Sequence, residues 1–276
     1  MSVSPLITPI GSHFLSENCT GLGNAMFQTA AVYGVAKKAN LQPNYNKVID
    51  YCNLLKKRFG FHHGETIFRN FQIPFTSSKN TNYIIEPSNQ MLVEVLFQIN
   101  PSSDNILNGY YEAISYFDNY KEEIQTLFSP DEESLNTLKE QFPYLFDNTV
   151  TVGVHFRLNH THRFLSNEAY RKCVNIMKKN LGENILFLIF TDDIHSTNLD
   201  IFYDCNYKVI NTQKDYLDMW ALSMCKNYIL SLSTFAFWGY YLNNSFDGKI
   251  LVPPFEKDWY NEAAENTIEG FKTNIS

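Results

Sequence analysis

His155 and Arg157 are the residues of this sequence that are best suited to phosphate chemistry. They lie at the end of residues 150–156, an apolar segment typical of a buried β-strand. Side chains two positions apart on a strand point to the same face. Arginine can grip a diphosphate through its planar donor fork and stabilise negative charge on a leaving group, and an imidazole can hydrogen-bond a base or a ribose. A strand-end salt bridge is the competing interpretation of Arg157.

Two other polar pairs stand where apolar segments begin or end. Asp192-Asp193 follow residues 185–190 and could accept hydrogen bonds from a base or ribose, bind a divalent metal, or only cap a turn. Ser233-Thr234 precede an apolar helical segment, where hydroxyl and N–H groups suit either a phosphate or an ordinary helix cap.

Gly21-Leu22-Gly23-Asn24 opens a segment with helical periodicity that continues to Ala39. Glycines there permit positive φ and close approach to a ligand, and free amides at a helix start favour anions. A tight turn that packs a helix on a sheet explains the same residues. The third glycine of the dinucleotide fingerprint is missing, which disfavours an NAD enzyme.

Histidines at positions 155, 160 and 162 could be taken for a metal cluster. No carboxylate or cysteine joins them at the spacing of metal ligands, so we expect no metal site.

The elements that must position these residues are clearest in the second half. Strands are predicted over 150–156, 185–190, 208–210, 228–230 and 249–252, with helices from Ser166, from Asp215 and over 235–242 between them. This alternation favours a doubly wound parallel sheet, and ligands bind at the carboxyl ends of its strands. The polar residues above fall at those ends. Residues 45–148 are mixed, and the turn at Asp147-Asn148 suggests two domains, 1–148 and 149–276.

Composition narrows the class of protein. The chain has 276 residues, 44 % of them hydrophobic, and a net charge of −7, which argues against a nucleic-acid binder. No stretch of about 18 apolar residues is present, and the amino terminus makes a poor signal peptide. Five scattered cysteines without a Cys-x-x-Cys pair suit reduced thiols. We expect a cytoplasmic protein and leave peripheral association with a membrane surface open.

Taken in order, five segments resemble the motifs of the α-1,2-fucosyltransferases, glycosyltransferase family 11. They are Gly21–Gln28, Asn108–Tyr111 with Tyr116-Phe117, His155-Phe156-Arg157, Phe190–Asp193, and Asp218–Lys226 with Ser233–Gly239. Five motifs in one order are far more specific than any one of them.

The resemblance implies an α/β fold of the GT-B type, with two Rossmann-like domains facing a central cleft. It also implies inverting, metal-independent transfer of fucose from GDP-fucose, held mainly by the second domain, to the 2-hydroxyl of a galactose in an oligosaccharide acceptor, without a cofactor. Arg157 would then contact the β-phosphate, and His155 and one of Asp192 and Asp193 would lie near guanine. The other implied donor contacts are Ser233, Thr234 and Phe235, with Gly23 and Asn24 from the opposite domain.

The sequence also departs from the family pattern. Leu158, Asn159 and His160 stand where the family has Arg, Gly and Asp. His160 replaces the motif aspartate and is therefore our first candidate for the catalytic base, before Glu112 and Asp218. The departures keep two alternatives open: a transferase of another GDP-sugar, and a glycan- or nucleotide-binding homologue that has lost catalysis.

Overall fold

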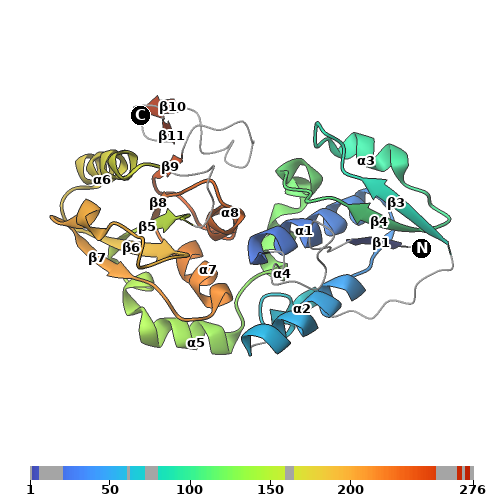
Figure 1. The fold of residues 1–276 in the computed structure, drawn as a ribbon, viewed down its shortest axis with the longest axis horizontal. Coiled ribbons are helices and arrows are strands. Elements are labelled where there is room, and N and C mark those ends of the chain that lie inside the picture. Colours follow the sequence, from blue (N-terminus) through green and yellow to red (C-terminus); the bar gives the residue numbers. More distant parts are fainter. Residues whose placement is uncertain are drawn as a thin grey trace. The chain divides into compact units, whose positions relative to one another are not determined.

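The structure, a computed structural model, describes residues 2–5, 21–60, 63–71, 80–158, 165–252, 266–268 and 271–273 (Figure 1). The chain divides into two compact units, Met1–Pro130 (unit 1) and Asp131–Ser276 (unit 2). Among the described residues no helix is both long and apolar enough to span a bilayer.

Unit 1 is built on a parallel four-stranded sheet in the order β2-β1-β4-β3. The strands are β1 (Ser2–Pro5), β2 (Gln42–Pro43), β3 (Thr81–Ile85) and β4 (Asp104–Asn108). The α-helices are α1 (Leu22–Ala39), α2 (Asn46–Phe59), α3 (Leu92–Gln98) and α4 (Lys121–Leu127). Short 3₁₀-helices cover His63–Glu65, Arg69–Phe71, Ile114–Tyr116 and Asp118–Tyr120.

Helix α1 is the central helix of unit 1 and is buried on most of its surface. It ends at Asn40, whose φ of 53° closes the helix in the left-handed conformation, and Lys37 and Lys38 occupy its last turn. A Cβ atom on Gly34 would lie 2.0 Å from the main-chain oxygen of Tyr116, so only glycine allows this contact.

Unit 2 contains a seven-stranded sheet in the order β10-β11-β9-β8-β5-β6-β7. Its strands are β5 (Val150–Phe156), β6 (Ile185–Thr191), β7 (Asn206–Val209), β8 (Asn227–Ile229), β9 (Ile250–Val252), β10 (Asn266–Ile268) and β11 (Phe271–Thr273). The five strands from β9 to β7 are parallel, and β11 and β10 continue the sheet antiparallel. The helices are α5 (Glu132–Gln141), α6 (Asn167–Leu181), α7 (Asp215–Ser223) and α8 (Thr234–Tyr241), with 3₁₀-helices at Pro143–Leu145 and Leu199–Phe202.

The strand order reverses between β5 and β8. From β5 the chain runs through α6 to β6 and on to β7, then returns through α7 to β8 on the other side of β5. In doubly wound sheets ligands bind outside the carboxyl ends of the strands at such a reversal. The candidate site of unit 2 is therefore expected beyond Phe156 and Ile229.

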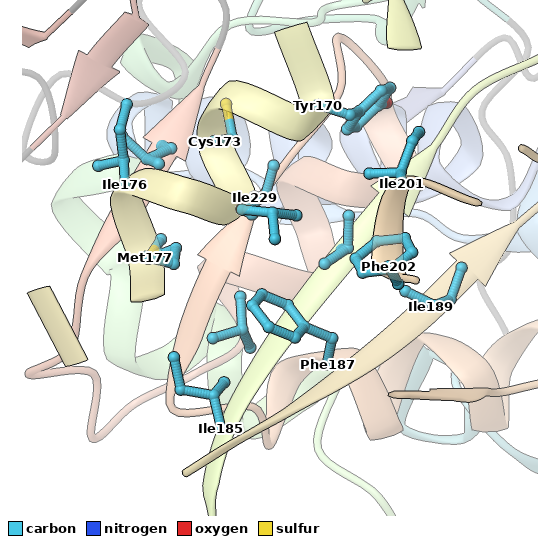
Figure 2. Close-up of a cluster of buried hydrophobic side chains, with 14 of the residues drawn as sticks. Tyr170, Cys173, Ile176, Met177, Ile185, Phe187, Ile189, Ile201, Phe202 and Ile229 are labelled. Carbon is cyan, nitrogen blue, oxygen red and sulfur yellow. The ribbon is translucent and has the colours of Figure 1, made fainter. Parts of the chain in front are cut away.

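Helix α6 covers one face of the sheet and forms a core with it (Figure 2). Tyr170, Cys173 and Met177 of α6 lie with Phe187 and Ile229 in this cluster of buried side chains. Each fully buried side chain of this size contributes about 1.5–3 kcal/mol. The Oγ atom of Ser166 accepts a hydrogen bond from the Ala169 amide at 3.1 Å, the cap expected from the sequence.

The opposite face of β5 packs on α7. A Cβ atom on Gly153 would lie 2.7 Å from Cδ1 of Leu222 and 3.0 Å from Sγ of Cys225. Because alternate residues of a strand share a face, His155 points to this same side, whereas Val154 and Phe156 point toward α6.

The strands predicted for the second half are present with small shifts, the largest at β7, which covers Asn206–Val209 where the sequence suggested 208–210. The boundary between the two compact units falls between Pro130 and Asp131 in the sequence, so that α5 belongs to unit 2. The sequence suggested a boundary after Asn148.

Candidate active site

His155 lies at the carboxyl end of β5 and is only 4 % exposed. Its Nδ1 atom is 2.7 Å from Oγ of Ser231, which follows β8. Its ring stacks on Phe235 of α8, with the centroids 5.4 Å apart and an interplanar angle of 27°. The carbonyl of His155 accepts a hydrogen bond from the Tyr170 hydroxyl at 2.9 Å. The imidazole is thus held between β5, β8 and α8, where the strand order reverses.

Burial lowers the pKa of His155 from 6.5 to about 3; the charge of Asp192 opposes this shift and that of Arg157 adds to it. The imidazole is therefore neutral at physiological pH. This suits a hydrogen-bonding group for a base or ribose, and it does not suit a proton-transfer group that works near pH 7.

Arg157 is held by Asp192. Its Nη1 atom donates to Oδ2 of Asp192 at 2.7 Å, and the other carboxylate oxygen accepts from the Leu158 amide at 2.8 Å. The Arg157 side chain is 31 % exposed and that of Asp192 18 %. The strand-end salt bridge is therefore present. It engages one of the three guanidinium nitrogens, and a guanidinium carries five N–H donors, so a diphosphate can still be bound by the others.

Asp193 caps the turn that follows β6. Its Oδ1 atom accepts from the amides of His195 and Ser196 at 3.0 and 3.2 Å, and its Oδ2 atom from the Ser196 hydroxyl at 2.6 Å. The Ser196 hydroxyl and amide lower the pKa of the Asp193 carboxyl. This is the turn-capping arrangement that the sequence left open as an alternative to ligand binding.

Helix α8 begins beside His155. Ser233 is its N-cap residue, in an extended conformation, and within the described chain its side chain accepts no capping hydrogen bond. The first intrahelical bond runs from the Phe237 amide to the Ser233 carbonyl at 2.9 Å. Amides of the first helical turn have no intrahelical acceptor, and the helix dipole favours an anion at this end. Thr234 and Phe235 follow in the first turn and are half-buried.

The Gly21–Asn24 motif belongs to unit 1. Gly21 is the N-cap of α1 with φ of −62°, and its carbonyl accepts from the Asn24 amide at 3.1 Å. The positive φ that glycine would permit is not used at Gly21. The motif opens a helix, as the sequence predicted, and that helix begins at Leu22, with Gly23 buried and Asn24 half-buried in its first turn.

A family model described as glycosyl transferase family 11 matches residues 20–272, which cover the Gly21 motif, the β5 end and α8. The chain belongs to glycosyltransferase family 11. It is 24 % identical to the O-antigen biosynthesis glycosyltransferase WbnK of Escherichia coli, over 91 % of this chain and 97 % of that protein. It is 26 % identical to an alpha-1,2-colitosyltransferase of Escherichia coli, over 90 % of this chain and 93 % of that protein.

Two solved structures share the fold of this family 11 chain. NodZ alpha-1,6-fucosyltransferase of Bradyrhizobium, co-crystallised with GDP, matches with a TM-score of 0.54 at 14 % identity over 92 % of this chain and 95 % of that one. A mutant of Arabidopsis thaliana FUT1 in complex with GDP matches with a TM-score of 0.52 at 11 % identity. The match covers 94 % of this chain and 71 % of that one. The predicted α/β fold of the GT-B type is confirmed by these similarities.

Within the family 11 chain, unit 2 brings His155, Arg157 and Asp192 together with the start of α8. Ser231, which the sequence analysis did not single out, joins them through its bond to His155. The available signal was its place two residues after β8, at the same sheet edge as His155. His160 lies in residues 159–164, outside the described residues. Among the described residues no group of three His, Cys, Asp or Glu side chains could hold a metal ion.

Proposed function

We propose that this family 11 glycosyltransferase moves fucose from GDP-fucose to the 2-hydroxyl of a galactose in a glycan, by an inverting displacement that needs no metal or cofactor. The observation that carries the proposal lies where the strand order reverses: His155 stacks on Phe235 in the first turn of α8, and Arg157, two residues further on, is held by Asp192. A cation and a helix amino end at that edge suit a nucleoside diphosphate.

In the proposed complex, Arg157 and the first amides of α8 bind the diphosphate and stabilise the charge that develops as GDP departs. Asp192 fixes the guanidinium through its own ion pair. The neutral imidazole of His155 hydrogen-bonds the nucleoside. The remaining donor contacts that we propose within unit 2 are Asp193, Ser233, Thr234 and Phe235. The donor contacts that the family resemblance implies for Gly23 and Asn24 stay predictions.

The transfer is one displacement through an oxocarbenium-like transition state. The acceptor oxygen forms a bond to the anomeric carbon while the bond to the β-phosphate oxygen breaks, and the acceptor proton passes to a base. His160 stays our first candidate for that base and Glu112 the second. Asp218 is the weakest candidate, because its Oδ1 atom already accepts bonds from the amide and hydroxyl of Thr212 at 2.9 and 2.7 Å.

A second candidate function is the transfer of another GDP-linked sugar by the same site. The 26 % identity to an alpha-1,2-colitosyltransferase favours it, because that name specifies a different transferred sugar. A third candidate, a homologue that binds without turnover, rests on Leu158 and His160 in place of the motif residues. In each case we propose a nucleotide sugar and a glycan as partners, with the protein acting in the cytoplasm or at a membrane surface.

The test is a thermal-shift screen against GDP, UDP, NAD and GDP-sugars, followed by transfer to a panel of galactosides in EDTA and assignment of the new linkage by NMR. We expect stabilisation by GDP, and transfer from GDP-fucose that fails in Arg157→Ala. Stabilisation by UDP or NAD but not by GDP would overturn the donor assignment. Glycan binding without donor hydrolysis or transfer would instead identify the inactive homologue.

A further inference from the structure

A turn at the carboxyl end of β4 in unit 1, residues Gly109–Glu112, is here named the Tyr110 turn. Strand β4 ends at Asn108, and β3 runs parallel to it and ends at Ile85. The Glu86 amide extends the pairing with a bond to the Asn108 carbonyl at 3.0 Å. Glu86 and the Tyr110 turn therefore lie at the edge of the unit 1 sheet where parallel sheets bind ligands.

The carboxylate of Glu86 clamps this turn. Its Oε2 atom accepts a hydrogen bond from the Tyr111 amide at 2.8 Å, and its Oε1 atom accepts from Nε2 of Gln90 at 3.0 Å. Gly109 makes room for it, because a Cβ atom there would lie 2.4 Å from Cβ and 2.7 Å from Oε2 of Glu86. The clamp thus depends on two residues: Glu86, which follows β3, and Gly109, which follows the neighbouring strand β4.

The clamped turn is strained. Tyr111 has φ of 52°, a left-handed conformation that costs free energy for any residue with a Cβ atom. Its ring is fully buried, and its hydroxyl donates to the Ile84 carbonyl at 3.1 Å. Holding Tyr111 in this state fixes the directions of the residues on either side of it: Tyr110, which is 38 % exposed, and Glu112, which is 7 % exposed.

Two buried polar atoms beside the turn have no hydrogen-bond partner among the described residues. Gln28 donates from Nε2 to the Gly109 carbonyl at 2.7 Å, but its Oε1 atom is unpaired. The hydroxyl of Tyr116 is likewise unpaired, and its ring contacts that of Tyr111 with the centroids 5.1 Å apart. Both side chains are buried, so an enclosed water molecule is the partner that suits these two atoms.

The charges around the turn fit a neutral, hydroxyl-rich ligand. Burial raises the pKa of Glu86, and the charge of Glu112 adds to that shift. Carboxylate oxygens accept hydrogen bonds from hydroxyl groups, and an exposed tyrosine offers an apolar ring with a polar tip. A saccharide presents hydroxyls and apolar C–H faces together. An anionic ligand, in contrast, would be repelled by the carboxylates of Glu86 and Glu112.

We propose that the Tyr110 turn is the contact of unit 1 with the saccharide acceptor, and that Glu86 is its positioning residue. The inference rests on the proposed function, since it assigns the acceptor of that reaction. Tyr110 and Glu112 touch the sugar, and Glu86 acts only through the conformation of the turn. A clamp that merely stabilised unit 1 would leave acceptor affinity unchanged, which separates the two roles.

The experiment compares Tyr110→Ala and Glu86→Gln, with methyl β-galactoside as acceptor and GDP-fucose as donor. Asp104→Asn is the matched control, because Asp104 is a buried carboxylate at the other end of β4 and accepts from the Ser2 hydroxyl at 2.7 Å. We expect the KM for the galactoside to rise about 10-fold or more in the two turn variants. Hydrolysis of GDP-fucose without acceptor and the GDP-induced thermal shift should stay within about twofold of wild type.

The inference is overturned if the turn variants raise the galactoside KM no more than Asp104→Asn does, or if donor hydrolysis falls in step with transfer. If Glu86→Gln does not fold, the half-exposed Tyr110→Ala decides alone, and an unchanged KM there contradicts the proposal. Wild-type protein that neither binds GDP nor turns over GDP-fucose would refute the proposed function instead.

Discussion

Asp192 divides its two carboxylate oxygens between Arg157 and the Leu158 amide. Asp192→Asn keeps the shape but removes the charge that holds the guanidinium. Because hydrogen bonds to charged groups contribute about 1.5–3 kcal/mol, we expect kcat/KM for GDP-fucose to fall about 10-fold or more. Asp204→Asn is the matched control, since Asp204 pairs with Arg171 at the same 2.7 Å outside the site. Equal losses in both variants would contradict a role for Asp192 in the site.

The lowered pKa of His155 should make the stability of the protein, rather than its turnover, depend on pH. That pKa is about 3 in the folded chain and about 6.5 when unfolded, so between these values the unfolded chain binds more protons. Stability should therefore rise with pH across this window, by up to about 1.4 kcal/mol per unit from this group. Urea unfolding of His155→Gln should therefore show a flatter dependence of stability on pH than wild type. Identical slopes in wild type and His155→Gln would contradict the assignment.

The sequence placed Arg157 and His155 correctly at one sheet edge, because two-residue periodicity fixes their common face. It could not show that Asp192 holds Arg157, or that Ser231 bonds His155. Those contacts join residues 35 and 76 positions apart and depend on which strands are neighbours. Local patterns do not specify strand order.

Among the elements, the packing of α7 against β5 and α8 determines where the amino end of α8 lies. Leu222 of α7 fits between Gly153 and Gly239: a Cβ atom on Gly239 would lie 2.4 Å from Cδ2 and 2.6 Å from Cγ of Leu222. The distance of α8 from the sheet, and with it the position of Ser233, follows from this contact.

Gly239→Ala should therefore destabilise unit 2 by about 1–3 kcal/mol and weaken GDP binding. In a Leu222→Ala background the same change should cost less, because the clashing side chain is gone and the two effects are coupled. Denaturant unfolding and GDP titration of the four proteins give the coupling energy. Strictly additive effects would contradict this account of how α8 is placed.

The elements that sequence periodicity predicted well are those with a full buried face. In α6, Tyr170, Cys173 and Met177 recur at helical spacing and are buried. Strand β3 was missed because only Ile84 is buried in it, so neither alternation nor a continuous apolar run marks it. Strands β10 and β11 were missed because each contains a single apolar residue, Ile268 or Phe271, whereas the equally short β9 is an apolar run.

At the scale of the whole molecule, the boundary between unit 1 and unit 2 lies before α5 because α5 packs within unit 2. The sequence marked the Asp147-Asn148 turn, but the preceding helix contributes buried Leu138 to unit 2, and Asp131 caps it by accepting from the Ser134 amide at 2.7 Å. A pattern of turn residues cannot show which neighbour a helix packs on.

Residues 131–276 should therefore fold alone and bind GDP, since the donor contacts proposed for unit 2 all lie within them. A fragment of residues 149–276 lacks α5 and should be less stable, by about 2 kcal/mol or more, because α7 loses its cover. Thermal unfolding and GDP titration of both fragments check this. A 149–276 fragment as stable as the longer one would contradict the boundary at Asp131.

The central claim, that Arg157 binds the β-phosphate of GDP, is tested most directly by calorimetric titration of GDP and GMP into wild type and Arg157→Ala. Wild type should prefer GDP about 10-fold or more, because GMP lacks the second phosphate, and the variant should lose most of that preference. The same ratio of GDP to GMP affinity in both proteins would contradict the account.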